Sequence, residues 1–258
     1  MKKVFITLAA AAFASAAFAQ QTLFNAMDTG GYWGGSNAFG TVAANINEQG
    51  QVFGLAVANS SITGFDMDML SGAGLTGTMA YNDIQIQVSF FSGFQSTYAG
   101  SGNEFNTPVY TQTFDLGANT LTNNAYYSLS GTPAAPFFQL TTPVAVSGSN
   151  IGVQFAFLAD TGNGLAAATT LQTTWLIGAT GPSVGSNSFQ YPNLAWGESG
   201  GTNSSASIAQ LNYWYGGSNY ANVDLGVRLY GTAAPEPVSM TFLGLGVLGL
   251  IARRRNRS

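Results

Sequence analysis

Apolar and polar residues alternate along several short stretches of this chain, a period typical of β-strands. The clearest stretch, Ile84-Gln-Ile-Gln-Val-Ser-Phe90, has four apolar residues on one face and three polar residues on the other. In 62–70 the same period puts Ile62, Gly64, Asp66 and Asp68 on one face, opposite Thr63, Phe65, Met67 and Met69. We expect a half-buried strand there. Further strands are predicted at 51–58, 109–114, 137–140, 151–158, 171–177, 208–214 and 223–230.

Clusters of Gly, Ser, Asn and Pro separate these stretches, and no segment between 20 and 234 shows the pattern of a helix of ordinary length. The alanines at 166–168 are expected to form a loop or a single turn. Many short strands with frequent turn signals are typical of antiparallel sandwiches. The sequence therefore predicts an all-β fold, a single antiparallel β-sandwich that is jelly-roll-like and spans 20–234.

The first 19 residues have the features of a secretory signal peptide. Lys2 and Lys3 precede an almost wholly apolar stretch at 4–18, and Ala17-Phe18-Ala19 supplies the small-residue pattern that signal peptidase cleaves. We expect cleavage after Ala19, which leaves Gln20 as the first residue. A retained N-terminal anchor is the alternative, and the small-residue site argues against it.

The C-terminal residues 235–258 form a second targeting segment with three parts. Pro235-Glu236-Pro237 comes first, then an uncharged apolar run at 238–252, and then Arg253, Arg254 and Arg255. As a helix the run would rise about 22 Å, so it is a short transmembrane helix for a hydrocarbon core of about 30 Å. The arginines should stay cytoplasmic, and the bulk of the chain should face the other side of the membrane.

This tail resembles the PEP-CTERM sorting signal of Gram-negative bacteria, and the resemblance is limited to 235–257. It implies that a membrane transpeptidase-like enzyme, an exosortase, recognises the tail and cleaves near Pro-Glu-Pro. It also implies delivery to the cell envelope, the outer surface or an extracellular polysaccharide matrix such as a biofilm, after transient anchoring in the inner membrane. An ordinary C-terminal membrane anchor is the alternative.

Charge and composition narrow the function of the region between the two targeting segments. That region contains ten acidic residues and a single basic residue, Arg228, so it repels phosphate and nucleic acid is not expected as a partner. The chain has no Cys and no His, which removes disulfides, catalytic triads that use either residue, and His- or Cys-based zinc sites. We therefore expect a non-enzymatic protein.

Three acidic residues are candidate calcium ligands. Asp66 and Asp68 point to one face of the strand predicted at 62–70, and Asp83 is close by in sequence. Calcium takes six to eight oxygen ligands, which carboxylates and backbone carbonyls supply. A solvated outer face is the alternative explanation, and a carboxylate pair of a glycan hydrolase is a third. Calcium is the only cofactor that the sequence suggests.

Aromatic residues offer a second candidate site, for carbohydrate. Exposed rings cover the apolar faces of sugars in many binding modules, while neighbouring amides bind the hydroxyl groups. The alternative is that these rings pack in the core. The candidate glycan-binding residues are Trp33, Trp196, Trp214, Tyr213 and Tyr215, with Trp175 as the remaining tryptophan.

The sequence therefore favours an exported, non-enzymatic envelope or matrix protein with a structural or adhesive role associated with exopolysaccharide. A carbohydrate-binding β-sandwich module is the alternative, followed by a glycan hydrolase. Signal peptidase and an exosortase-type enzyme are the expected processing partners.

Overall fold

The fold consists of antiparallel β-strands. The computed structural model describes residues 20–27, 32–33, 46–72, 75–92, 108–168, 170–173, 175–177, 182–187, 194–198, 213–215 and 223–233. These residues form 19 strands and no helix, and the strands pair antiparallel throughout. The all-β antiparallel class expected from the sequence is confirmed. The predicted signal peptide and the C-terminal sorting segment lie outside the described residues.

The first large sheet, called sheet 1 below, is built around the long strand β4. Its order is β1–β19–β4–β10, and β9 and β13 also pair with β4. The strands are β1 (Gln21–Asn25), β19 (Val227–Ala233), β4 (Ser60–Ser71), β10 (Phe138–Ala145), β9 (Ala125–Leu129) and β13 (Leu171–Thr173).

The second large sheet, sheet 2, has the order β17–β16–β3–β11–β6–β7, with β12 paired to β11 and β15 paired to β3. Its strands are β17 (Tyr213–Tyr215), β16 (Leu194–Glu198), β3 (Ile46–Gly54), β11 (Asn150–Asp160), β6 (Asp83–Phe91), β7 (Tyr110–Asp115), β12 (Leu165–Ala167) and β15 (Ser186–Asn187). Two small sheets complete the described structure: β18 (Val223–Leu225), β14 (Trp175–Ile177) and β2 (Tyr32–Trp33), and β5 (Thr78–Tyr81) with β8 (Asn119–Thr122).

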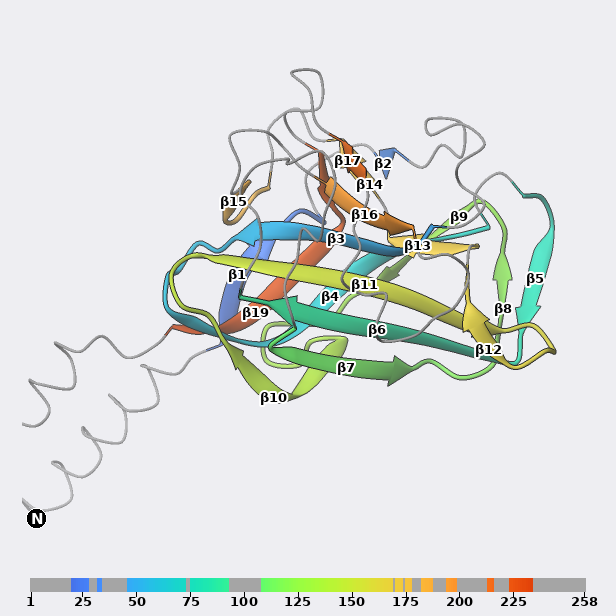
Figure 1. The fold of residues 1–258 in the computed structure, drawn as a ribbon, viewed down its shortest axis with the longest axis horizontal. Coiled ribbons are helices and arrows are strands. Elements are labelled where there is room, and N and C mark those ends of the chain that lie inside the picture. The colour runs from blue at the N-terminus through green and yellow to red at the C-terminus, as the bar shows by residue number, and fades with distance from the viewer. Residues whose placement is uncertain are drawn as a thin grey trace, which may run out of the picture.

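The apolar faces of the two large sheets share one hydrophobic core. Figure 1 shows strands of sheet 2, such as β3, β11 and β6, in front of β19 and β4 of sheet 1. Phe65 of sheet 1 lies 5.5 Å from Phe155 and 5.6 Å from Phe114 of sheet 2, measured between ring centroids. The alternating residues Ile84, Ile86, Val88 and Phe90 of β6 are all buried in this core, as their two-residue period predicts.

Side-chain hydrogen bonds connect the edge strand β7 of sheet 2 with the edge strand β10 of sheet 1. Gln112 accepts a hydrogen bond from the backbone N–H of Thr141 (2.9 Å) and donates one to the carbonyl of Gln139 (3.3 Å). The Tyr110 and Thr141 hydroxyls lie 2.8 Å apart. These side chains satisfy backbone groups of β10 that an edge strand would otherwise expose for pairing with another chain.

A β-bulge in β4 overturns part of the predicted alternation. Opposite β19 the pairing moves from Tyr230↔Gly64 to Gly231↔Ile62, so Thr63 is the extra residue. Ile62 and Phe65 are therefore both fully buried in the core, whereas unbroken alternation places them on opposite faces. Gly231 fits this point because an added Cβ would lie 2.1 Å from the carbonyl oxygen of Ser61.

Other strand predictions match the structure to different degrees. The predicted strands at 84–90, 109–114 and 151–158 correspond to β6, β7 and β11. The strand predicted at 51–58 is β3, which ends at Gly54, and residues 56–59 form a bend instead. The loop expected at 166–168 is wrong in part, because Leu165–Ala167 pairs with β11 as β12.

Candidate functional site

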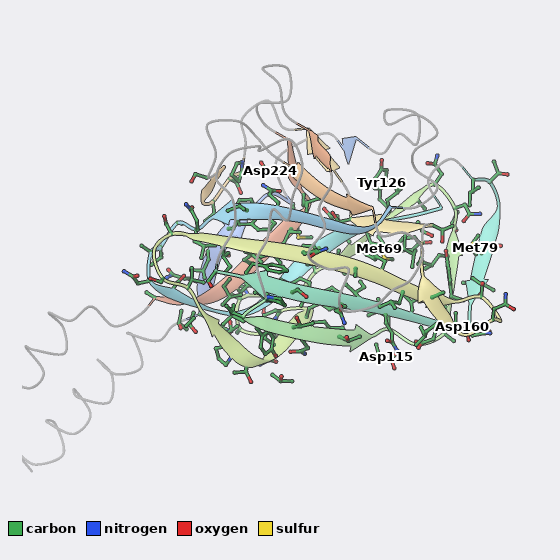
Figure 2. The ribbon with its side chains drawn as sticks, viewed as in Figure 1. Met69, Met79, Asp115, Tyr126, Asp160 and Asp224 are labelled. Carbon is green, nitrogen blue, oxygen red and sulfur yellow. The ribbon has the colours of Figure 1, made fainter. Side chains whose placement is uncertain are left out.

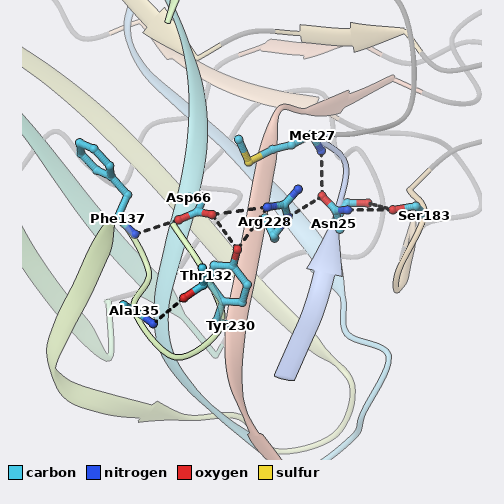
Figure 3. Close-up of polar contacts among 9 residues, drawn as sticks. All are labelled: Asn25, Met27, Asp66, Thr132, Ala135, Phe137, Ser183, Arg228 and Tyr230. Atoms are coloured by element: carbon cyan, nitrogen blue, oxygen red, sulfur yellow. Dashed lines mark hydrogen bonds and ion pairs between the residues drawn. The ribbon is translucent and has the colours of Figure 1, made fainter. Parts of the chain in front are cut away.

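A polar row crosses the outer face of sheet 1 and contains the basic residue that lies between the predicted targeting segments. Arg228 on β19 is paired in register with Asn25 on β1 and with Asp66 on β4. Directly opposed residues of antiparallel strands have side chains close enough to interact. Figure 3 shows Asp66, Arg228 and Asn25 in contact across the three strands.

Asp66 is the centre of this row. Its Oδ2 accepts a hydrogen bond from the Tyr230 hydroxyl (2.7 Å) and lies 3.6 Å from Nη1 of Arg228. Its Oδ1 accepts one from the backbone N–H of Phe137 (2.9 Å). The Asp66 side chain is 0% exposed and that of Arg228 is 18% exposed. A carboxylate this deeply buried requires a cation and hydrogen-bond donors, and Asp66 has both.

The row also holds two loop segments against the sheet. At one end, the segment that contains the Thr132–Ala135 bridge is joined to Asp66 through the N–H of Phe137. At the other end, Asn25 accepts from Nε of Arg228 (3.1 Å) and donates from Nδ2 to the Ser183 hydroxyl (2.9 Å). The network therefore connects three strands and two loops, so its role is to stabilise the fold.

Burial raises the pKa of the Tyr230 hydroxyl above its usual value of 10.0, and the hydrogen bond to Asp66 adds to the effect. Because this pKa is higher in the folded state, the contribution of Tyr230 to stability is fully present below pH 10 and is lost as pH rises through the raised value.

We expect Tyr230→Phe to lower the free energy of unfolding at pH 7 and to reduce its loss above pH 10. The variant lacks the hydrogen bond to Asp66, and bonds to charged groups contribute about 1.5–3 kcal/mol. Urea unfolding of wild type and Tyr230→Phe from pH 7 to 11.5 measures both effects. Equal alkaline loss in wild type and Tyr230→Phe would contradict this assignment.

Asp68, the next candidate calcium ligand along β4, is also buried, with 2% of its surface exposed. The solvated outer face considered for Asp66 and Asp68 is therefore wrong. The sheet pleat does put both on one face, but loop segments such as the one ending at Phe137 cover that face. Burial of the two aspartates could not be inferred from alternation alone.

Asp83 lies in the other large sheet, at the first residue of β6, and its Oδ2 accepts from Nε2 of Gln85 (2.9 Å). Within the described ranges, no three Asp, Glu, His or Cys side chains come together as a group that could hold a metal ion. The structure thus places Asp66 and Asp68 apart from Asp83, and no calcium-binding role is proposed for the three.

Sequence reasoning missed a second buried polar pair, Gln51 and Asp224. The Gln51 amide donates to a carboxylate oxygen of Asp224 and accepts from the backbone N–H of Leu225 (2.8 Å). Both side chains are nearly inaccessible, at 4% and 2% exposure. The pair fastens β18 to β3, although 173 residues separate the two side chains in the chain. No local signal in the sequence identifies such a partner.

The turn after β11 is organised by Asp160. Its Oδ1 accepts hydrogen bonds from the backbone N–H groups of Gly162 (2.7 Å) and Gly164 (2.9 Å). The hydrogen bond from Gly162 is the main cause that holds the pKa of Asp160 below 3.8. A lowered carboxyl pKa contributes stability above the unfolded-state value, and this contribution is lost as pH falls through the folded-state value.

We expect Asp160→Asn to remove this acid sensitivity while keeping the turn, because the amide oxygen still accepts from both glycine N–H groups. In wild type, backbone NMR shifts of Gly162 and Gly164 should titrate with a midpoint below pH 3.8. In the variant they should stay constant over the same range. A midpoint above 3.8 in wild type would refute the capping role.

The candidate aromatic residues lie on strands that come together from distant parts of the chain. Trp33 on β2 is paired in register with Trp175 on β14, and Trp196 on β16 with Tyr213 on β17. Trp214 is opposite Ala195, and Tyr215 is opposite Leu194. Strand β18, the partner of β14, also contacts β16 and so connects the two groups. Figure 1 shows β2, β14, β16 and β17 on the same side of the molecule.

The predicted sorting residues Pro235, Glu236, Pro237, Arg253, Arg254 and Arg255 lie outside the described residues. In the described part of the chain, no helix reaches the length and apolarity needed to span a bilayer. Comparisons with known protein families, with curated proteins and with solved structures find no match.

Proposed function

We propose that the chain is an exported protein of the cell envelope or extracellular matrix, in which 20–234 is the mature domain and the two terminal segments direct sorting. The observation that carries this proposal is the placement of the strands. The described fold starts with β1 at Gln21 and ends with β19 at Ala233. The first and last described strands thus lie next to the predicted signal-peptidase site and to Pro235 in the sequence.

Within this proposal the mature domain is a single β-sandwich of the jelly-roll kind. Two antiparallel sheets that share one core support this architecture. An exosortase-type enzyme recognises Pro235, Glu236 and Pro237. The apolar run at 238–252 and the arginines that follow it hold the precursor in the inner membrane until cleavage.

The role proposed for the domain is structural or adhesive, in association with exopolysaccharide, and not enzymatic. The polar network of sheet 1 supports this view, because Asp66 is engaged by Arg228, Tyr230 and a backbone N–H, and so acts as an internal fastener. The excess of acidic over basic residues disfavours nucleic acid and suits a hydrated, weakly interacting matrix.

The sorting proposal is tested by replacing Pro235, Glu236 and Pro237 with alanine in the native host. We expect the variant to accumulate in the membrane fraction with its tail intact, while wild type loses the tail. Pro143→Ala, which changes an exposed proline of β10, is the matched control and should behave as wild type. Normal processing of the triple variant would overturn the sorting assignment.

A second candidate function, a carbohydrate-binding module, is favoured by the assembly of the tryptophan-bearing strands. Trp33, Trp175, Trp196 and Trp214 lie on four strands that pairing and contact join into one region. Trp196 and Tyr213 are directly opposed across β16 and β17 and so share one face of that strand pair, which supports a sugar-binding role for these two residues.

Binding of the purified protein to exopolysaccharide from the native host tests this second function. We expect Trp196→Ala to weaken binding at least tenfold while thermal stability is unchanged, with the exposed Tyr126→Ala as control. Unchanged binding would contradict a sugar-binding role for Trp196. A loss of binding that follows a loss of stability would show that Trp196 has a packing role instead.

A further inference from the structure

The two ends of the described fold lie side by side at one end of sheet 1. Strand β1 begins and β19 finishes there, and Gln21 is paired in register with Gly231. Gln20 is already attached to the fold, because its side-chain amide donates to the Thr63 hydroxyl (2.5 Å). Figure 1 shows β1 and β19 next to each other at the left of the molecule. We call this the terminal end.

The distance from the terminal end to either predicted apolar segment is short. Phe18 precedes Gln20 by two residues, which reach at most about 7 Å when extended. Val238 follows Ala233 by five residues, which reach at most about 17 Å. These limits hold for any conformation of the connecting residues, so a membrane-inserted segment at either terminus keeps the terminal end close to the bilayer.

The terminal end is also uncharged over its described residues. Two described turns at this end, 54–61 and 145–150, contain no Asp, Glu, Lys or Arg, and neither do the described strand residues 20–24 and 229–233. Its exposed residues are small or polar, among them Ala58, Asn59 and Ser147. Such a surface approaches a lipid surface without burying a charge or bringing a like charge to anionic head groups.

The opposite end of the molecule carries carboxylates. Asp83 and Asp160 are paired in register where β6 begins and β11 ends, and Asp115 is paired with Gln85 at the end of β7. Figure 2 shows Asp115 and Asp160 toward the right of the molecule, away from β1 and β19. Strand β11 has 11 residues, so at about 3.3 Å per residue roughly 35 Å separates this acidic end from the terminal end. That separation is several Debye lengths at physiological salt.

We propose that the precursor stands on the membrane with its terminal end against the lipid surface and its acidic end pointing away. The proposal rests on the proposed function, because it requires a terminal segment to be inserted. The short connections from Phe18 to Gln20 and from Ala233 to Val238 hold the terminal end at the bilayer. The carboxylates of the acidic end disfavour an orientation in which the domain lies flat on anionic lipid. The acidic end and the sides of the two-sheet body are then the surfaces that contact the matrix.

Single-cysteine labelling tests the orientation cleanly, because the chain has no native Cys. Ser147→Cys labels the terminal end and Thr161→Cys labels the acidic end, and both residues are exposed. The full-length precursor is reconstituted in vesicles of three parts phosphatidylcholine to one part phosphatidylglycerol that carry an acceptor dye on the head groups. A short-range donor dye on each cysteine then reports proximity to the lipid by energy transfer.

We expect at least twofold more energy transfer from the Ser147→Cys label than from the Thr161→Cys label, relative to the same samples in detergent. Equal transfer from both labels, or more from the Thr161→Cys label, on protein that floats with the vesicles would overturn the orientation and leave the proposed function intact. Failure of both variants and of the wild-type precursor to float with the vesicles would overturn membrane anchoring itself, and the orientation with it.

Discussion

Replacement of Arg228 with methionine is expected to lower the free energy of unfolding by roughly 3 kcal/mol, because it leaves the Asp66 carboxylate buried without its cation. Removal of one partner from a buried ion pair costs about 3–5 kcal/mol. The lower end applies here, since Asp66 keeps its hydrogen bonds from Tyr230 and from the Phe137 N–H. Arg228 is also partly exposed, so solvent screens some of its charge.

A double-mutant cycle measures this coupling by urea unfolding at pH 7. Asp66→Asn alone and Arg228→Met alone should each destabilise the protein, and the double variant should be more stable than the sum predicts by about 1 kcal/mol or more. Arg228→Lys is the matched control, because it keeps the charge but loses the bond from Nε to Asn25. Strict additivity of the two single changes would mean that the pair does not stabilise the fold.

Truncation of Phe65 to alanine is expected to cost about 3–5 kcal/mol, the usual range for a buried phenylalanine. Its ring contacts Phe138 within sheet 1 at 4.7 Å, and Phe114 and Phe155 in sheet 2 at 5.6 and 5.5 Å. The change therefore opens a cavity where the two sheets meet. Thermal and urea unfolding measure the loss.

The control for this prediction is Phe137→Ala, which removes a ring that is 46% exposed and contacts only Phe138 among the described aromatic residues. We expect a loss of about 1 kcal/mol or less, in line with one edge-to-face aromatic pair. The Asp66 hydrogen bond is kept because it comes from the backbone of residue 137. Similar losses for the two variants would contradict the placement of Phe65 at the centre of a shared core.

The class of the fold was predictable because its signal is local. Strand β6 alternates without interruption, so its buried face could be identified residue by residue. The buried face of β4 could not be identified in this way, because the bulge at Thr63 changes the face of every residue that precedes it. Short strands such as β5 and β8, with four residues each, contain too few positions for a period to be recognised.

The candidate sites depended on information that the sequence does not contain. Asp66 and Asp68 were correctly expected on one face of β4, but their burial depends on loops that return to cover that face. Arg228 was identifiable as the single basic residue between the targeting segments, yet its partner Asp66 is defined only by strand register. The in-register pairing of Trp33 with Trp175 is likewise defined only by the pairing of strands far apart in the chain.

The measurement that tests the central claim most directly is the intact mass of the protein from the native host, taken on envelope and culture-medium fractions. Our account predicts a mature chain that begins at Gln20 and ends between Pro235 and Pro237. A chain that still ends at Ser258 would contradict it, and would mean that the C-terminal segment is an ordinary membrane anchor.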